Sequence, residues 1–245
     1  MSHGIATPTH PLAHYPAAGH GDVPLWADPQ DVDGAPRLLA LHVSALPAGS
    51  VSRHGITITH TSDLSHPAWL GYAGLRRGDP GTWGQRGRDQ AVVAYAAAHY
   101  PLWRHELARQ SLVSGAFDEH FTVLGQTETT VCIGDAYRIG EATVQVSSPH
   151  QPETDLSQRL QVPDLAQRLL TSGRTGWCYR VLGEGYIQEG QPLILQDRPY
   201  PEWPVARVLA VCLAHRHHAL PATTAVADLR GCTQLSQSWR RLLGT

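Results

Sequence analysis

The sequence predicts a mainly β protein with accompanying helices, and three observations support this fold class. Residues 142–148 (ATVQVSS) alternate apolar and polar side chains, which is the period of a half-buried strand. Residues 136–139 (AYRI) form a second short strand, and the Gly140-Glu141 pair turns the chain between the two. Residues 37–44 (RLLALHVS) and 55–59 (GITIT) have the composition of further strands. At 245 residues the chain is long enough to bury a sizeable core.

The first 36 residues are predicted to form an extended arm. They are rich in His, Pro, Gly and Ala and show neither a helical nor a strand period. Because they contain few apolar residues, burial would not offset the entropy lost on ordering them. We therefore expect the folded domain to begin near residue 37.

Three segments are predicted to be helical. Residues 101–110 (PLWRHELARQ) begin with Pro, which suits a first helical turn, and carry a narrow apolar stripe. Residues 163–172 (PDLAQRLLTS) place Asp164 in the first turn and Gly173 just past the end. Residues 205–213 (VARVLAVCL) are apolar enough for a helix that packs against the sheet.

Further short strands complete the prediction. Residues 131–133 (VCI) form one, and residues 174–181 (RTGWCYRV) form another in which alternate side chains share a face. Residues 186–187 and 193–195, joined by a turn at residues 189–190, are predicted to form a hairpin of the kind that closes a small barrel.

Bulk properties exclude several classes of protein. The formal net charge of -2 and the pI near 6.7 give no reason to expect binding to nucleic acid or to an anionic membrane. The four cysteines are widely separated, which argues against a disulfide framework and against a thiolate zinc site. An apolar run near 18 residues and a charged-then-apolar leader are both absent, so we expect a cytoplasmic protein without a membrane span.

The central run TETTVCIGDAYRIGEATVQVSSPHQP, residues 127–152, resembles the centre of a MOSC domain, the module found at the C-terminus of molybdenum cofactor sulfurase. It is most similar to stand-alone bacterial MOSC proteins linked to resistance against N-hydroxylated purines. Residues 74–95 and 173–181 resemble two further motifs of the family, and residues 235–239 resemble the helical C-terminal appendage of the purine-analogue branch.

The resemblance implies a fold and a domain organisation. The fold is a MOSC-like β-barrel with peripheral helices and a short helical C-terminal appendage. Residues 1–36 would be the His/Pro-rich arm, residues 37–200 the barrel domain, and residues 201–245 the appendage.

One position departs from the family in a way that changes its chemistry. The family places a Cys after a Pro-x-x-Pro stretch, and its thiol carries sulfur or binds molybdenum; this chain has Glu153 there. A carboxylate cannot carry sulfur, so sulfur transfer through this position is excluded. Glu153 is then a carboxylate ligand to the metal, a general acid or base, or a solvated loop residue.

Four candidate catalytic residues follow. His150 lies three residues before Glu153, and a His and a carboxylate this close can act as a proton-shuttling pair. An exposed loop His is the alternative. Glu119 matches a family carboxylate, and His120 stands beside it. The family fold implies that these four side chains converge on one pocket.

The candidate cofactor-binding residues are mostly basic. Arg174 lies next to a helix end, where it could hold a phosphate bidentately, and it is the strongest candidate. Arg180 and Trp177 lie in the same strand, and Arg88 comes from an earlier loop. Asp89 would brace the pocket. The alternative is that half of these arginines are ordinary surface residues.

Cys132 and Cys178 are the thiols inside the predicted barrel strands. Each stands between apolar or aromatic neighbours, so each is predicted to be a buried small hydrophobe. A displaced catalytic thiol is the alternative.

Three functional hypotheses remain open. The resemblance implies a protein that binds molybdenum cofactor (molybdopterin), or a related phosphorylated small molecule, and supports reduction of N-hydroxylated compounds with a redox partner protein. Molybdenum ion binding and pyridoxal phosphate binding are properties implied for the family. Alternatively, the barrel is a molybdenum-independent enzyme that uses His150 and Glu153 for acid/base chemistry, or a non-catalytic binding protein. The oligomeric state is left open.

Overall fold

The computed structural model describes residues 34–42, 67–76, 87–152, 155–216 and 223–244. The strand predicted at residues 55–59, nearly all of the predicted arm and Glu153 lie outside these ranges.

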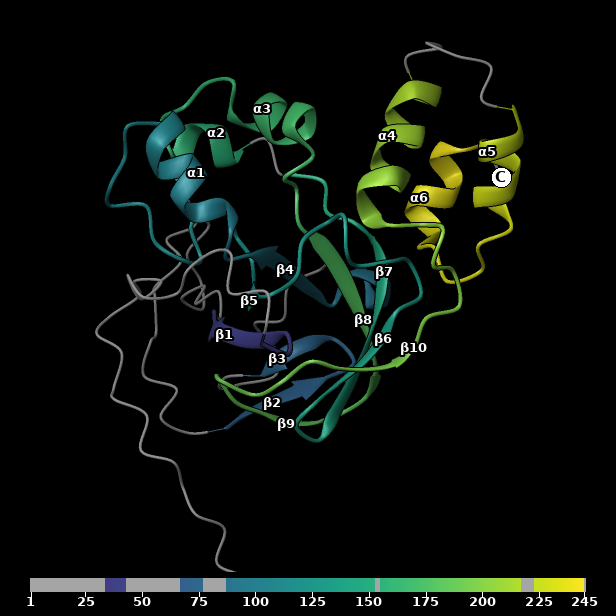
Figure 1. Cartoon of the computed structure of the whole chain (residues 1–245), viewed down its shortest axis with the longest axis horizontal. Coiled ribbons are helices and arrows are strands. Elements are labelled where there is room, and N and C mark those ends of the chain that lie inside the picture. The colour runs from purple at the N-terminus through teal and green to yellow at the C-terminus, as the bar shows by residue number, and fades with distance from the viewer. Residues whose placement is uncertain (1–33, 43–66, 77–86, 153–154, 217–222, 245) are drawn as a thin grey trace, which may run out of the picture.

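Seven strands form one curled sheet in the order β1-β5-β4-β8-β7-β6-β10 (Figure 1). Neighbours pair antiparallel except β4 and β5, which pair parallel. The strands are β1 (Arg37–Leu41), β4 (Val92–Ala96), β5 (Phe121–Leu124), β6 (Ala136–Ile139), β7 (Ala142–Pro149), β8 (Trp177–Gly183) and β10 (Ile194–Asp197).

Backbone hydrogen bonds join the two edges of this sheet. Leu38 N donates to Gln191 O at 2.9 Å, and Leu193 N donates to Pro36 O at 2.7 Å, so the segment just before β10 runs along β1. The sheet therefore curls into a barrel-like shape, as the sequence predicted.

The hairpin predicted at residues 186–195 is wrong. β9 (Gly185–Ile187) joins a second, three-stranded sheet with β2 (Ala68–Gly71) and β3 (Gly74–Arg76). The two strands are separated because the turn between them binds to β1: Glu189 Oε1 accepts from Leu41 N at 2.7 Å. The local pattern predicted both strands but not the partner of each.

Apolar side chains on the inner face of the large sheet form its core, and the C-terminal helices extend that core without a break. The helices α4 (Val205–Arg216), α5 (Thr223–Arg230) and α6 (Gln237–Leu242) lie in the region predicted as the appendage. They contribute to the barrel's own cluster with the buried residues Val205, Val208, Leu209, Cys212, Val226, Leu229, Leu235, Trp239 and Leu243.

A second apolar cluster lies beneath the other helices, α1 (His99–Glu106), α2 (Asp155–Arg159) and α3 (Leu165–Ser172). α3 ends where the sequence predicted, and Gly173 follows it in the left-handed conformation at φ +72°. α1 begins two residues earlier than predicted and ends at Glu106. None of the described helices combines the length and apolar character needed to cross a bilayer.

The strand predicted at residues 131–133 is reduced to a single antiparallel β-bridge, Cys132 with Pro204, and a turn built around a buried carboxylate follows it. Asp135 accepts hydrogen bonds from Cys132 N and from the Tyr137 hydroxyl, both at 2.9 Å. Arg198 donates to it through Nε at 2.8 Å and Nη2 at 2.7 Å. Because Asp135 is fully buried, these donors compensate for its lost hydration and fix the chain after β10 against the start of β6.

We predict that Asp135→Ala lowers the free energy of unfolding by about 3 kcal/mol, because it leaves buried donors without an acceptor. Urea unfolding followed by circular dichroism measures this. The control is Asp164→Ala, which removes an exposed carboxylate at the start of α3 whose ion-pair partner is Arg168; it is expected to shift the urea midpoint far less than Asp135→Ala. Equal midpoints for the two variants would contradict the role given to Asp135.

Candidate functional site

The outer face of β7 and β8 carries a row of polar side chains. Arg180 on β8 donates from Nε to Asp89 Oδ1 and from Nη1 to Gln145 Oε1, each at 3.0 Å. Arg180 and Asp89, both predicted as cofactor-binding residues, are thus brought together. The alternation of β8 explains the orientation, because Tyr179 and Val181 point into the core on the opposite face.

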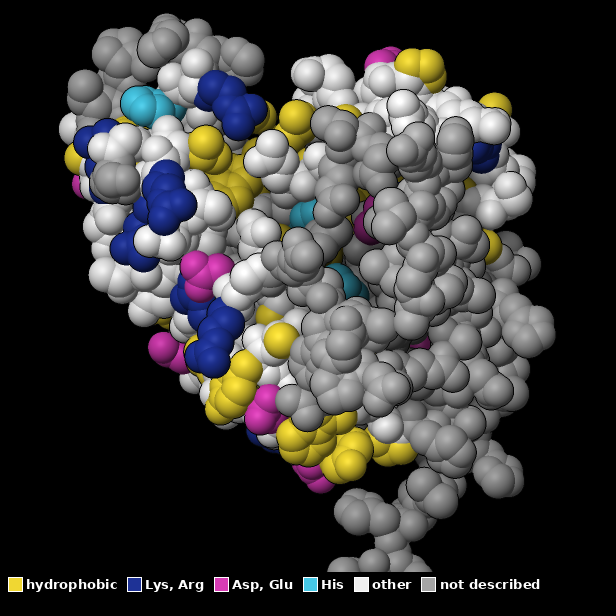
Figure 2. All heavy atoms as spheres, turned by 180° about the vertical axis from the view of Figure 1, so that it is seen from behind, with side chains coloured by type: hydrophobic (Ala, Val, Ile, Leu, Met, Phe, Trp, Pro, Cys, Tyr) yellow, Lys and Arg dark blue, Asp and Glu magenta, His cyan; other side chains and the backbone are white. Residues whose placement is uncertain are grey.

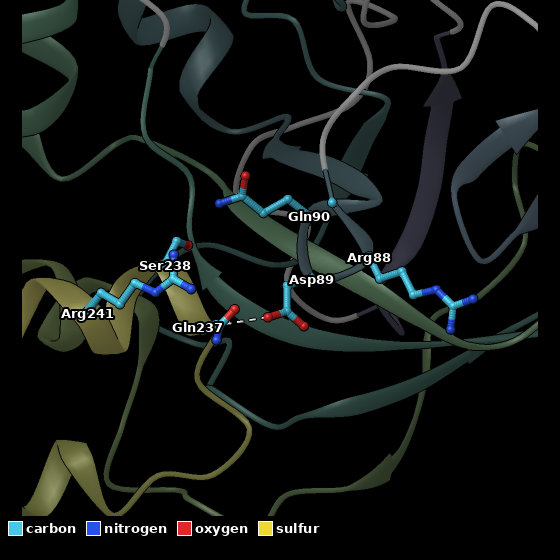
Figure 3. Close-up of a pocket in the computed structure, with 7 residues that line it drawn as sticks. Arg88, Asp89, Gln90, Gln237, Ser238 and Arg241 are labelled. Carbon is cyan, nitrogen blue, oxygen red and sulfur yellow. Dashed lines mark hydrogen bonds between the residues drawn. The ribbon is translucent and has the colours of Figure 1, made fainter. Parts of the chain in front are cut away.

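Asp89 lies in the short 3-10 turn η2 (Arg88–Gln90) and connects three elements. The Ser147 hydroxyl on β7 donates to the Asp89 carbonyl. The second carboxylate oxygen of Asp89 accepts from Gln237 N, at the start of α6, at 3.1 Å (Figure 3). The turn η2 is therefore fixed against the barrel on one side and against α6 on the other.

A pocket of about 410 Å³ opens between η2 and α6. Figure 3 shows Arg241 extending beside Ser238 on α6 and Gln90 reaching in from η2, whereas Arg88 extends away from Asp89. Neither Arg88 nor Arg241 forms an ion pair with a described residue; the Arg88 guanidinium lies 5.9 Å from the centre of the Tyr72 ring. The pocket is lined by Gly87, Arg88, Asp89, Gln90, Gln237, Ser238 and Arg241.

His150 follows β7 and is buried against β8. Its Nδ1 lies 3.9 Å from Cys178 Sγ, and its backbone N–H donates to Gly176 O at 3.0 Å. Cys178 is buried, as predicted. The proposed partner Glu153 lies outside the described residues, so the His150–Glu153 pair stays a prediction.

Arg174 has partners that the sequence did not reveal. Its Nη2 donates to both carboxylate oxygens of Glu106, at 2.8 and 2.9 Å, and its guanidinium lies 3.9 Å from the Trp103 ring centre. The sequence expectation of an open phosphate-binding cation therefore needs correction. Glu106, the last residue of α1, occupies Arg174. The arginines that line the η2–α6 pocket are instead Arg88 and Arg241.

Trp177 also needs correction as a cofactor-binding residue. Its side chain is 0 % exposed and belongs to the barrel core with Tyr179. In a strand, alternate residues share a face, so placing Tyr179 inward places Trp177 inward as well.

Glu119 lies in the interior, where it organises a turn. Its carboxylate accepts from Gly115 N at 2.7 Å, from the Thr122 hydroxyl at 2.9 Å and from the hydroxyl of Tyr100. Burial raises the pKa of Glu119, and these hydrogen bonds oppose the rise in part. The structure therefore places Glu119 as a structural carboxylate rather than a pocket-facing one.

His120 bonds to the sheet beside it. Its Nδ1 accepts from Val93 N at 3.0 Å, and its backbone carbonyl accepts from His42 N at 2.8 Å. The described contacts of Glu119 and His120 run to α1, β4 and β5, whereas those of His150 run to β8. The expected convergence of these three side chains is not seen among the described contacts.

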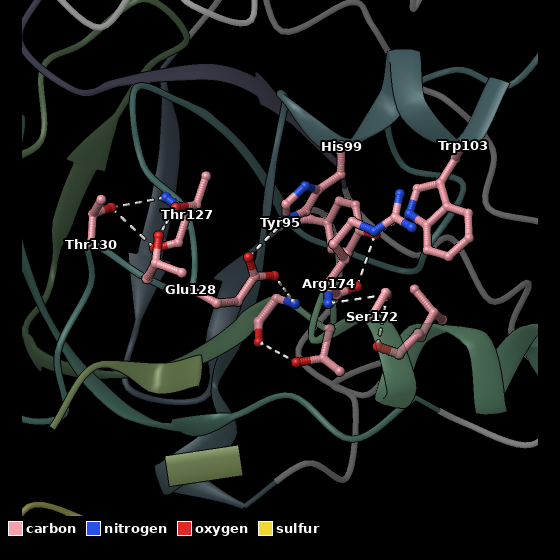
Figure 4. Close-up of polar contacts among 12 residues, drawn as sticks. Tyr95, His99, Trp103, Thr127, Glu128, Thr130, Ser172 and Arg174 are labelled. Atoms are coloured by element: carbon pink, nitrogen blue, oxygen red, sulfur yellow. Dashed lines mark hydrogen bonds and ion pairs between the residues drawn. The ribbon is translucent and has the colours of Figure 1, made fainter. Parts of the chain in front are cut away.

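Sequence reasoning missed a buried His–Glu pair next to His150. His99 Nε2 lies 2.7 Å from Glu128 Oε2, and Glu128 Oε1 accepts from Gly176 N at 2.6 Å (Figure 4). Gly176 adopts φ +75°, and a Cβ there would lie 2.3 Å from Ala94 O, so this approach requires glycine. Gly176 links the pair to the His150 backbone, because its N–H donates to Glu128 and its carbonyl accepts from His150 N. The pair is hard to recognise from the sequence, because Glu128 lies inside a run of threonines and is well separated from His99.

The residues present fit some cofactors better than others. The chain contains no lysine, so pyridoxal phosphate cannot be held as a lysine aldimine. Among the described residues, no group of three or more His, Cys, Asp or Glu side chains is arranged to hold a metal ion. Burial raises the pKa of Cys212 to about 12 and of Cys232 to about 11, which keeps both as thiols. The η2–α6 pocket is lined by guanidinium, amide and hydroxyl groups, which can donate hydrogen bonds to an anion.

The fold defines the class of protein: the chain belongs to the MOSC domain family, whose model matches residues 78–194. The crystal structure of YiiM from Geobacillus stearothermophilus superimposes with a TM-score of 0.71 at 31% identity, covering 85% of this chain and 97% of that one. YiiM from Escherichia coli superimposes with a TM-score of 0.65 at 27% identity, covering 85% of this chain and 89% of that one.

The relatives found by sequence differ in length, so this chain covers a different share of each. The chain is 39% identical over 156 residues to the uncharacterized protein YflK of Bacillus subtilis, covering 63% of this chain and 67% of that protein. It is 29% identical over 201 residues to a protein named reductase from Gibberella moniliformis, covering 81% of this chain and 35% of that protein. The chain therefore spans about a third of this larger relative.

We predict that Glu119→Gln becomes more stable relative to wild type as the pH rises from 4 to 7. Burial raises the folded-state pKa of Glu119, so its contribution to stability is fully present below the unfolded pKa and is lost as the pH rises through the folded one. Glutamine keeps the shape without the charge. Urea unfolding of both proteins at several pH values measures the difference, and a difference that falls with pH would contradict this reasoning.

Proposed function

We propose that this MOSC-family protein binds molybdenum cofactor, or a related phosphorylated small molecule, in the η2–α6 pocket. With a redox partner protein, it would support reduction of N-hydroxylated compounds in the cytoplasm. The observation that carries the proposal is the pocket itself: the Arg241 guanidinium has no ion-pair partner among the described residues, while Asp89, the one acidic residue of the lining, is already paired with Arg180.

The charge balance of the pocket favours an anion. The lining contains two arginines and a single carboxylate, Asp89, whose charge Arg180 offsets. The Arg88 guanidinium extends away from Asp89, so Arg241 is the cation on the α6 side of the pocket. Arginine remains protonated under all ordinary conditions and matches the oxygens of a phosphate with a fork of N–H groups. An anionic ligand therefore gains charge-assisted hydrogen bonds without displacing an existing pair.

The remaining lining suits a polar heterocycle. Gln90 and Gln237 each offer an amide donor and acceptor, the groups needed to recognise the edge of a pterin. When bound, the cofactor would supply two-electron redox chemistry. The chain's residues would bind and orient it, with Glu153 as the predicted carboxylate ligand in place of the family thiol.

The reductive role is supported by the relative named reductase. Because this chain spans about a third of that protein, the source of electrons belongs to the proposal as a separate redox partner.

A second candidate is a molybdenum-independent enzyme that uses acid/base chemistry at the end of β7. It is favoured by His150, whose Nδ1 lies 3.9 Å from Cys178 Sγ and whose backbone N–H donates to Gly176 O. Gly176 N in turn donates to Glu128, which holds the His99 imidazole. An imidazole fixed by a carboxylate is a common arrangement for proton transfer.

We predict that freshly purified protein contains stoichiometric molybdenum and pterin, and that Glu153→Ala loses most of the molybdenum because its carboxylate ligand is gone. Elemental analysis and mass spectrometry of released small molecules measure both. The control is Glu202→Ala, an exposed carboxylate before α4, which is expected to retain wild-type content. Absence of molybdenum from all three proteins would reject the cofactor proposal and leave the acid/base candidate for testing with Glu153→Gln.

A further inference from the structure

The η2–α6 pocket is built from two regions of different origin. Arg88, Asp89 and Gln90 lie within the span that the MOSC family model matches, residues 78–194. Gln237, Ser238 and Arg241 lie beyond it, on the last helix of the appendage. A binding residue on this helix would give the protein a specificity that the barrel alone does not encode.

The appendage is basic, whereas the remainder of the chain is acidic. Residues 201–245 contain five arginines and two acidic residues; residues 1–200 contain fourteen arginines and nineteen acidic residues. Figure 2 shows basic side chains spread over the lobe that the C-terminal helices form. The field of this lobe favours an anion at its junction with the barrel.

Arg241 is the appendage arginine that is both unpaired and at the pocket. Arg230 is occupied, because its Nε donates to Leu243 O at 2.9 Å. Arg207 donates to Glu202 O at 2.7 Å and lies over the Trp203 ring. The Arg241 guanidinium makes no hydrogen bond with a described residue, and the side chain extends beside Ser238 in Figure 3.

The helix that carries Arg241 is firmly held. Ser236 N donates to Ser147 O at 2.8 Å, and Gln237 N donates to Asp89 at 3.1 Å. Trp239 and Leu243 are buried in the barrel core. Ser238 and Arg241 are three residues apart, so they share a helix face, and their backbone is fixed before a ligand arrives.

We propose that Arg241, Ser238 and Gln90 form an anion subsite that binds the terminal phosphate monoester of the pocket's ligand. This inference rests on the proposed function only in using the same pocket. Arg241 offers a forked pair of N–H donors, Gln90 offers an amide N–H, and the Ser238 hydroxyl becomes a donor when Ser236, 3.1 Å away, donates to it. Together these groups provide up to four donors. A carboxylate can accept them with two oxygens, but a phosphate monoester distributes them over three terminal oxygens and carries a charge of about −1.5 to −2, so it gains more from Arg241.

The test compares ligands that differ in one anionic group. Binding of FMN and riboflavin is measured by fluorescence quenching with wild type and with Arg241→Ala, Arg241→Lys and Arg216→Ala. Arg216 is an exposed arginine at the end of α4, away from the pocket lining, and serves as the control. Thermal unfolding of each variant checks that it is folded.

We expect wild type to bind FMN at least about tenfold more tightly than riboflavin, because the phosphate adds charge-assisted hydrogen bonds. Arg241→Ala should abolish this preference, Arg241→Lys should retain part of it, and Arg216→Ala should retain all of it. Unchanged FMN preference in Arg241→Ala, or an equal loss in Arg216→Ala, would overturn the subsite. A second pair, 6-carboxypterin and pterin, tests the carboxylate: a preference as large as that for FMN would overturn the assignment to phosphate.

The molybdenum content of the same preparations separates this inference from the proposed function. Phosphate-dependent binding through Arg241 without molybdenum leaves the subsite standing and removes the cofactor proposal. If Arg241→Ala keeps its molybdenum and pterin and its FMN binding is unaffected, the subsite is overturned and the cofactor proposal stands.

Discussion

The ion pair between Asp89 and Arg180 is the contact on which the candidate site depends. One carboxylate oxygen of Asp89 binds Arg180 on β8, and the other accepts the first N–H of α6, so a single side chain joins barrel, turn and appendage. Arg180 also binds Gln145 on β7, which fixes its direction. The pair offsets the negative charge that would otherwise face an anionic ligand, and it positions Arg88 and Arg241 on opposite parts of the pocket wall.

Three buried carboxylates hold the loops around this barrel. Glu119 binds the turn before β5, Glu128 binds His99 and the loop before β8, and Asp135 binds the turn before β6 and Arg198. Each would be costly to bury alone, and each is compensated by several donors from chain segments far apart in sequence. The loops that surround the site are therefore fixed by polar contacts inside the protein.

The side chains available for binding and catalysis in this chain differ from those expected of the family. Where the family thiol stands, this chain has Glu153, and its permanently cationic side chains are all arginine, since the chain has no lysine. Both features favour oxygen and guanidinium contacts over covalent bonds to sulfur or to an amine. Recognition of an anionic, phosphorylated ligand is consistent with this set of residues, and the distribution of charge between barrel and appendage points to the same ligand class.

The sequence by itself determined the family, the strand pair β6–β7 and the end of α3 at Gly173, because these follow from local period, turn residues and a continuous motif. Tertiary structure alone decided the rest. Only the curled sheet directs Trp177 into the core, brings Glu106 onto Arg174, joins His99 to Glu128 and places Arg241 beside η2. Each of these depends on contacts between segments distant in the chain, and local sequence patterns do not specify which distant partner a side chain will meet.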